Sequence, residues 1–193
     1  MLRLKLPSDP RWANIAEKNI EEILTDHAFC EQKAASTAIS LLVTYPELDE
    51  LVRKMAALAR EEMSHFEMVH QRILDRGLSL GRERKDEYVA RINQFFPKTG
   101  DRKERLVNRL LIAALIEARS CERFKLLSEK LKDRELADFY HRLMISEANH
   151  YTMFLALARK YGNREETDRK WEALLDFEAE VMQDFNKSEK IHG

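Results

Sequence analysis

The sequence holds two copies of one short pattern, a glutamate followed three positions later by a histidine. Glu62 and His65 form the first copy, and Glu147 and His150 form the second. Residues three apart on an α-helix share a face, so each pair can present a carboxylate and an imidazole to one point. If both pairs bind at one site, the fold must bring two helices together around that site.

Each copy also has a glutamate upstream at nearly the same distance. Glu31 lies 31 residues before Glu62, and Glu117 lies 30 residues before Glu147. An interval of this length fits a helix, a turn and a second helix. Each half of the chain therefore predicts a helical hairpin that brings one glutamate to one Glu-x-x-His pair.

The composition agrees with long helices. Of 193 residues, five are Gly and four are Pro, while 35% are charged. That mixture suits solvated amphipathic helices and leaves little turn material for a sheet. The apolar periodicity and the helix-breaking residues predict helices over 10–22, 24–44, 48–75, 87–96, 104–130, 134–160 and 165–187, the first of them capped by Ser8 or Asp9.

The segment 76–103 joins the two hairpins and is long enough to be a crossover. The predicted fold is therefore all-α, a ferritin-like four-helix bundle with one long crossover and extra flanking helices. We expect a single domain over residues 1–193, with a frayed tail at 185–193.

Four carboxylates and two imidazoles make up the predicted ligand set. This mixture of oxygen and nitrogen donors suits iron or manganese, and no thiolate is present to favour zinc. The alternative is a metal-free bundle, in which each buried acid would have to be protonated or paired at a cost. The candidate metal ligands are Glu31, Glu62, His65, Glu117, Glu147 and His150.

Two further acid–histidine pairs are predicted to lie on the surface. Glu67 precedes His70 by three residues, but it follows Glu62 by five, roughly 140° around a helix, and faces elsewhere. Asp138 and His141 are likewise expected to form a pair on a helix surface.

Several residues near the ligands are weaker candidates for supporting roles. Glu61 and His27 could orient a ligand, His27 being four residues before Glu31, with ordinary helix positions as the alternative. Arg119 and Arg123 either guard the site or pair with buried acids.

The net charge of −1 hides a basic segment. Residues 76–109 hold ten Lys and Arg against five Asp and Glu, whereas residues 165–185 hold eight acidic residues against two basic ones. The two regions nearly cancel, so the total charge does not argue against a polyanionic partner.

Cysteine usage and hydropathy exclude other classes of protein. Cys30 and Cys121 form no Cys-x-x-Cys pair, which excludes a zinc ribbon or a rubredoxin-type site, and we expect both to be buried. No stretch approaches the roughly 20 apolar residues of a membrane span. The N-terminal segment also lacks the apolar run of a secretory signal, so the predicted location is the cytoplasm.

Four stretches of the sequence resemble the MiaE-type tRNA hydroxylases, a family of ferritin-like di-iron proteins. They are DHAFCEQKAASTA (26–38), LAREEMSHFEMV (58–69), LIEARSCERFKLL (115–127) and SEANHYTMFLALA (146–158), and the resemblance runs over about residues 10–180. It implies hydroxylation of the isopentenyl group of 2-methylthio-isopentenyladenosine, next to the anticodon of tRNA. It also implies that the six candidate ligands hold two iron ions, which use dioxygen and two electrons.

This resemblance suggests roles for two further groups of residues. Apolar side chains near the irons would receive the prenyl group, with plain core as the alternative: Phe29, Phe66, Leu115 and Phe124. Basic side chains would contact the tRNA anticodon loop, with solvated surface as the alternative: Arg82, Arg84, Lys85, Lys98, Arg102, Lys103 and Arg105.

The sequence has no flavin or ferredoxin signature, so electrons are expected from a separate reductase. Two other functions stay open. One is a ferritin-like iron-storage or ferroxidase protein, and the other is a di-iron oxygenase acting on a fatty aldehyde or another small molecule. The oligomeric state is not predicted.

Overall fold

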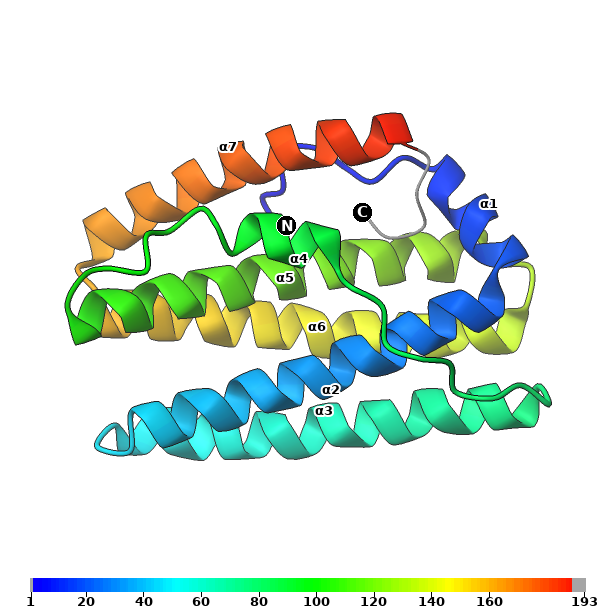
Figure 1. The fold of residues 1–193 in the computed structure, drawn as a ribbon, viewed down its shortest axis with the longest axis horizontal. Helices are drawn as coiled ribbons and strands as arrows, with labels where there is room; N and C mark the ends of the chain where they lie inside the picture. The colour runs from blue at the N-terminus through cyan, green and yellow to red at the C-terminus, as the bar shows by residue number, and fades with distance from the viewer. Residues whose placement is uncertain (1, 189–193) are drawn as a thin grey trace. The chain divides into compact units, whose positions relative to one another are not determined.

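The computed structural model describes residues 2–188, which form seven α-helices and no strand (Figure 1). The chain divides into two compact units, one of residues 18–85 and one of residues 1–17 with 86–193. No helix in the described part of the chain combines the length and apolar character needed to cross a membrane. The helices are α1 (Arg11–Lys18), α2 (Ile20–Thr44), α3 (Asp49–Asp75), α4 (Glu87–Ile92), α5 (Arg102–Lys130), α6 (Arg134–Tyr161) and α7 (Arg164–Ser188).

The unit of residues 18–85 is a hairpin of α2 and α3, which run antiparallel side by side (Figure 1). α2 ends before Tyr45-Pro46, as expected for a residue that precedes proline. α3 ends in a Schellman turn, in which Gly77 adopts a positive φ of 67°. The backbone N–H of Gly77 donates to Leu74 and that of Leu78 donates to Ile73, so the last carbonyls of α3 are satisfied.

The polar loop after this turn runs back along α2. The backbone N–H of Gly81 donates to Oγ1 of Thr25 over 3.3 Å. Farther along the loop, Arg84 forms an ion pair with Glu22 at 2.9 Å. The loop is therefore tied to α2 at two places.

In the other unit, α5 and α6 form the second predicted hairpin, and α7 packs on both of them. Three helices of this unit begin at an aspartate whose Oδ1 accepts the backbone N–H three residues later. Asp86 caps α4, Asp101 caps α5 and Asp133 caps α6, over 2.8, 2.8 and 3.0 Å. These caps set where the helices start.

The start of the chain differs in detail from the sequence-based expectation. The predicted helix 10–22 is interrupted at Asn19, whose backbone (φ −131°, ψ 44°) leaves the helical region and starts α2. Of the two candidate caps, Asp9 accepts the N–H of Arg11, whereas Ser8 donates its hydroxyl to Glu122. At the other end, α7 continues to Ser188, and the rest of the predicted tail, 189–193, lies outside the described residues.

A buried ion-pair network joins α7 and the N-terminal segment to α5. Arg119 is 2% exposed and donates from Nε and Nη2 to Oε1 of Glu178, over 2.9 and 2.6 Å. It also donates to the carbonyl oxygen of Leu6 and to Glu122. The hydroxyl of Tyr88 in α4 donates to the same oxygen of Glu178. Arg119 thus pairs with one buried acid, Glu178, and one half-buried acid, Glu122, which matches one of its two predicted roles.

Candidate metal centre

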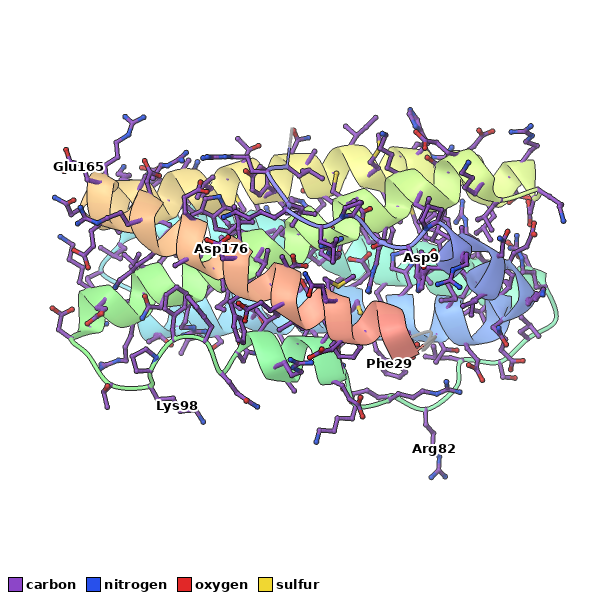
Figure 2. All side chains as sticks on the ribbon, turned by 90° about the horizontal axis from the view of Figure 1, so that it is seen from above. Asp9, Phe29, Arg82, Lys98, Glu165 and Asp176 are labelled. Atoms are coloured by element: carbon purple, nitrogen blue, oxygen red, sulfur yellow. The ribbon has the colours of Figure 1, made fainter. Side chains whose placement is uncertain are left out.

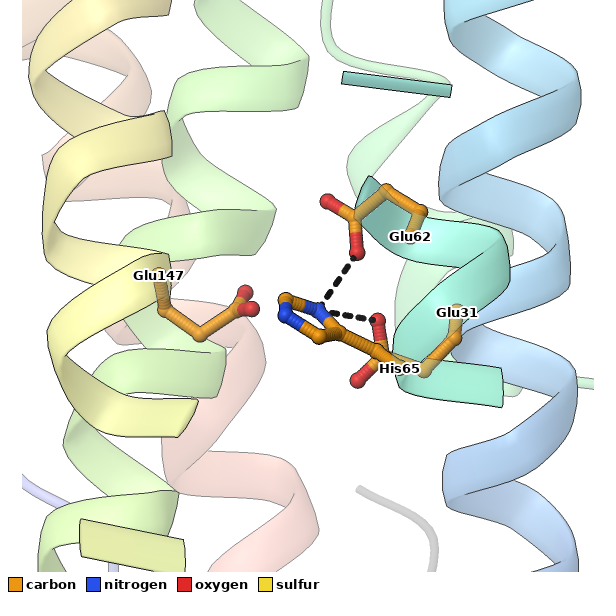
Figure 3. Close-up of side chains that lie close together, drawn as sticks. All are labelled: Glu31, Glu62, His65 and Glu147. Atoms are coloured by element: carbon orange, nitrogen blue, oxygen red, sulfur yellow. Dashed lines mark hydrogen bonds and ion pairs between the residues drawn. The ribbon is translucent and has the colours of Figure 1, made fainter. Parts of the chain in front are cut away.

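The α2–α3 hairpin brings together the first three predicted ligands, Glu31, Glu62 and His65 (Figure 3). All three are buried, and each offers a ligand atom within 4.8 Å of the others. Nδ1 of His65 lies 3.2 Å from Oε2 of Glu62 and 3.7 Å from Oε2 of Glu31. The predicted hairpin therefore forms a triad of two carboxylates and one imidazole.

Small buried side chains lie beside Glu31 on α2. Ala28, Ala35 and Ala38 are all at most 2% exposed, and they lie three, four and seven residues from Glu31. Those spacings place them on the face of α2 that carries Glu31. Glu31 on that face is buried as well, at 4% exposed.

The charges of this first triad depend strongly on one another. Burial alone raises the pKa of Glu31, but hydrogen bonds with His27 and His65 outweigh it and hold that pKa well below its usual range. Burial alone lowers the pKa of His65, but Glu31 and Glu62 raise it to about 10. At neutral pH the metal-free triad thus holds a protonated imidazole beside ionised Glu31.

The α5–α6 hairpin forms a second triad from Glu117, Glu147 and His150. These residues are also buried, and each offers a ligand atom within 4.8 Å of the others. Nδ1 of His150 lies 3.8 Å from Oε1 of Glu147, beyond hydrogen-bond distance. The same sequence repeat therefore produces the same kind of triad in both units, and the histidine lies farther from the glutamate of its own helix in the second.

The donor chemistry of both triads fits a metal centre. Each triad offers two carboxylates and one imidazole, without thiolate, which suits iron or manganese. Burying four carboxylates is costly without a compensating cation. His27 was only a weak candidate from the sequence, yet its Nε2 lies 2.6 Å from Oε1 of Glu31.

Three of the four residues in the other acid–histidine pairs lie on the surface, as the sequence predicted. Glu67, Asp138 and His141 are exposed, while His70 is half-buried and stacks on the ring of Phe66. The expectation that both cysteines are buried was wrong for Cys30, which is exposed.

The four predicted pocket residues differ in their surroundings. Leu115 and Phe124 are buried, and the ring of Phe124 lies 5.3 Å from that of Tyr140. Phe29 and Phe66 are half-buried. Their role in receiving a prenyl group stays a prediction.

The seven predicted tRNA-contacting residues are all exposed. Arg82 and Lys98 extend from the loops that carry them (Figure 2). Arg84 forms an ion pair with Glu22, and Arg105 donates a hydrogen bond to the carbonyl oxygen of Gly100. Their contact with tRNA stays a prediction.

Comparison with solved structures supports the predicted fold. A protein from Synechococcus described as having aldehyde deformylating oxygenase activity superposes with a TM-score of 0.87 and is 35% identical, covering 92% of this chain and 88% of that one. That protein is ferritin-like, so the predicted all-α, ferritin-like fold is confirmed.

Comparison of sequences gives two relatives, both named tRNA 2-(methylsulfanyl)-N(6)-isopentenyladenosine(37) hydroxylase. The protein from Pseudomonas putida is 38% identical over 98% of this chain and 91% of its own length. The protein from Salmonella typhimurium is 29% identical over 81% of this chain and 75% of its own length.

A family model described as tRNA-(MS2IO6A)-hydroxylase (MiaE) matches residues 2–193, nearly the whole chain. The match and the relative from Pseudomonas putida confirm the resemblance first seen in the four sequence stretches. The chain belongs to the MiaE family of tRNA hydroxylases.

Proposed function

We propose that this chain is a di-iron monooxygenase that hydroxylates the isopentenyl group of 2-methylthio-isopentenyladenosine next to the anticodon in tRNA. The observation that carries the proposal is the pair of buried Glu, Glu, His triads in a chain whose relatives are named as hydroxylases of that nucleoside. Family membership indicates the reaction, and the triads supply the chemical means.

The six triad residues together hold two iron ions in this proposal. The sequence repeat supports it, because two equal hairpins that each offer two carboxylates and one imidazole match the established ligand pattern of di-iron bundles. In the first triad, Nδ1 of His65 faces Oε2 of both Glu31 and Glu62. That nitrogen is the one positioned to bind the metal together with carboxylate oxygens.

The six residues would hold an iron pair, which would supply oxidising chemistry: dioxygen, two electrons and two protons are consumed, one oxygen atom enters a C–H bond and the other leaves as water. An allylic C–H bond needs this kind of chemistry, since acid–base groups alone do not activate it. The chain's own part is to hold six ligands in buried positions. Burial also keeps water away from the reacting groups.

Substrate binding would divide between apolar and basic residues. In this proposal the prenyl group lies against the predicted apolar residues. Two of them, Leu115 and Phe124, are buried residues of α5, the helix that carries Glu117. A base must leave its stack to reach a buried centre, as in other enzymes that modify bases. The exposed basic side chains from Arg82 to Arg105 would contact anticodon-loop phosphates.

The proposal also includes a separate reductase as the electron donor and a location in the cytoplasm, where tRNA is found. Repeated turnover by the purified chain with a nicotinamide cofactor alone would contradict the separate reductase.

One rival function has a specific observation in its favour. The Synechococcus protein of similar structure is described by its aldehyde deformylating oxygenase activity, so an aldehyde is a reasonable competing substrate. A storage protein of ferritin type is a second rival, and it would accumulate iron far beyond two ions per chain.

The deciding experiment offers both substrates to the iron-loaded protein with a chemical reductant and dioxygen. One reaction contains tRNA carrying the prenylated, methylthiolated adenosine, and the other contains a long-chain aldehyde. We expect mass spectrometry to show one added oxygen atom in the nucleoside and no product from the aldehyde. Glu62→Ala should abolish the reaction, whereas Glu67→Ala, an exposed glutamate of the same helix, serves as the matched control. Turnover of the aldehyde with unchanged nucleoside would refute the proposal.

A further inference from the structure

His27 lies beside the first triad, although the Glu-x-x-His repeat does not include it. It is 6% exposed and stands one helical turn before Glu31 on α2. Its Nε2 is 2.6 Å from Oε1 of Glu31. Because an ionised carboxylate only accepts hydrogen bonds, Nε2 carries the hydrogen and donates it to Oε1.

This contact gives the two oxygens of Glu31 different surroundings. Oε1 accepts from His27, whereas Oε2 is turned toward Nδ1 of His65, at 3.7 Å. A short hydrogen bond between two buried side chains fixes the rotation of the carboxylate about its last bond. Oε2 is therefore the oxygen of Glu31 that remains for a metal ion.

The second half of the chain has no histidine at the equivalent position. The residue four positions before Glu117 is Ala113, whose side chain has no polar atom to offer. The contact within the second pair is also longer, 3.8 Å between His150 and Glu147 against 3.2 Å between His65 and Glu62. The two halves of the chain therefore differ at the position four residues before the first glutamate of each triad, which is His27 in one half and Ala113 in the other.

We propose that His27 is a positioning residue that holds Glu31 with Oε2 toward the metal ion bound by Glu31 and His65. The inference rests on the proposed metal centre and adds a residue outside its ligand set. Hydrogen-bonded partners of this kind orient ligands and raise metal affinity, and their loss costs about 10- to 100-fold in affinity. His27 would therefore raise the metal affinity of the position formed by Glu31 and His65.

The test uses Co(II) alone as the probe, added without oxygen to the metal-free protein. Binding is followed by visible absorption and by competition with a chelator. His27→Leu removes the donor at similar size, and His27→Gln keeps an N–H donor at similar reach. His70→Gln makes the same chemical change at a histidine outside the triads, on α3, and is the matched control.

We expect wild type and His70→Gln to bind two Co(II) ions per chain with the same absorption spectrum. His27→Leu should weaken one ion by about tenfold or more and change the spectrum of that ion, and His27→Gln should restore most of both. Wild-type affinities and spectrum in His27→Leu would overturn the positioning role. A folded His27→Gln that loses one ion would overturn it too, because the loss would follow shape and not the donor. Wild-type protein that binds no Co(II) would instead remove the metal centre itself.

Discussion

Replacing Arg119 by methionine should strongly destabilise the unit that contains it. Arg119 is 2% exposed, and its partner Glu178 is fully buried. In the variant, the remaining hydrogen bond to Glu178 among residues 2–188 is that from Tyr88. Removing one partner of a buried ion pair costs about 3–5 kcal/mol, because the other charge stays buried without compensation. That loss is a large share of a typical unfolding free energy of about 5–15 kcal/mol.

Urea unfolding followed by tryptophan fluorescence measures this loss in the relevant unit. Both tryptophans of the chain, Trp12 and Trp171, belong to the same unit as Arg119. Arg142→Met is the matched control, since Arg142 is exposed and its replacement should change the unfolding free energy by no more than about 0.5 kcal/mol.

A double variant separates the ion pair from simple loss of packing. Glu178→Leu alone should also destabilise, because it leaves Arg119 buried beside an apolar group. The double variant Arg119→Met with Glu178→Leu should be less destabilised than the sum of the single variants by about 2 kcal/mol, since an apolar pair removes the uncompensated charge. Additive losses, or a loss under about 1 kcal/mol in Arg119→Met, would refute the reasoning.

Three other predictions concern the first triad, the end of α3 and the tRNA contact. Because the pKa of His65 is raised to about 10, its imidazole is protonated at pH 7, and a metal ion must displace that proton. Calorimetry of metal binding in buffers of different ionisation enthalpy should therefore show about one proton released from His65 per chain. The metal affinity should also rise with pH below 10. No proton release would contradict this. Gly77→Ala should cost about 1 kcal/mol in urea unfolding, because Gly77 has a φ of 67°, and Gly77→Asn should cost less; equal stability of all three proteins would exclude strain at this turn. Lys98→Glu with Arg102→Glu should weaken tRNA binding and lower the slope of log affinity against log salt by about 2, whereas an unchanged slope would place the tRNA elsewhere.

The grouping of Glu, Glu and His in each hairpin and the ends of α2 and α3 could be predicted because their signals are local. Residues three apart on a helix share a face whatever the surroundings, so Glu62 and His65 could be paired from the sequence alone. Pro46 and Gly77 stop helices through their own backbone preferences. Each of these inferences needed only the conformation of a few neighbouring residues.

The long-range partners could not be predicted, because they depend on how helices pack. The segment 165–185 has eight acidic residues, and nothing in their order indicates that Glu178 faces Arg119. Likewise, Arg84 was expected to be open to tRNA, but it is paired with Glu22, 62 positions earlier in the chain. The break at Asn19 did have a signal, since asparagine is a common residue at helix starts.

The most direct test of the proposed di-iron centre is the amount of iron bound per chain after anaerobic reconstitution, with Mössbauer spectroscopy of the loaded protein. We predict two iron ions per chain in wild type and in Glu67→Ala, and a loss of bound iron in both Glu62→Ala and Glu147→Ala, since each removes a carboxylate of one buried triad. Wild-type iron content in both of these variants, or no bound iron in wild type, would contradict the assignment of these triads as the metal centre.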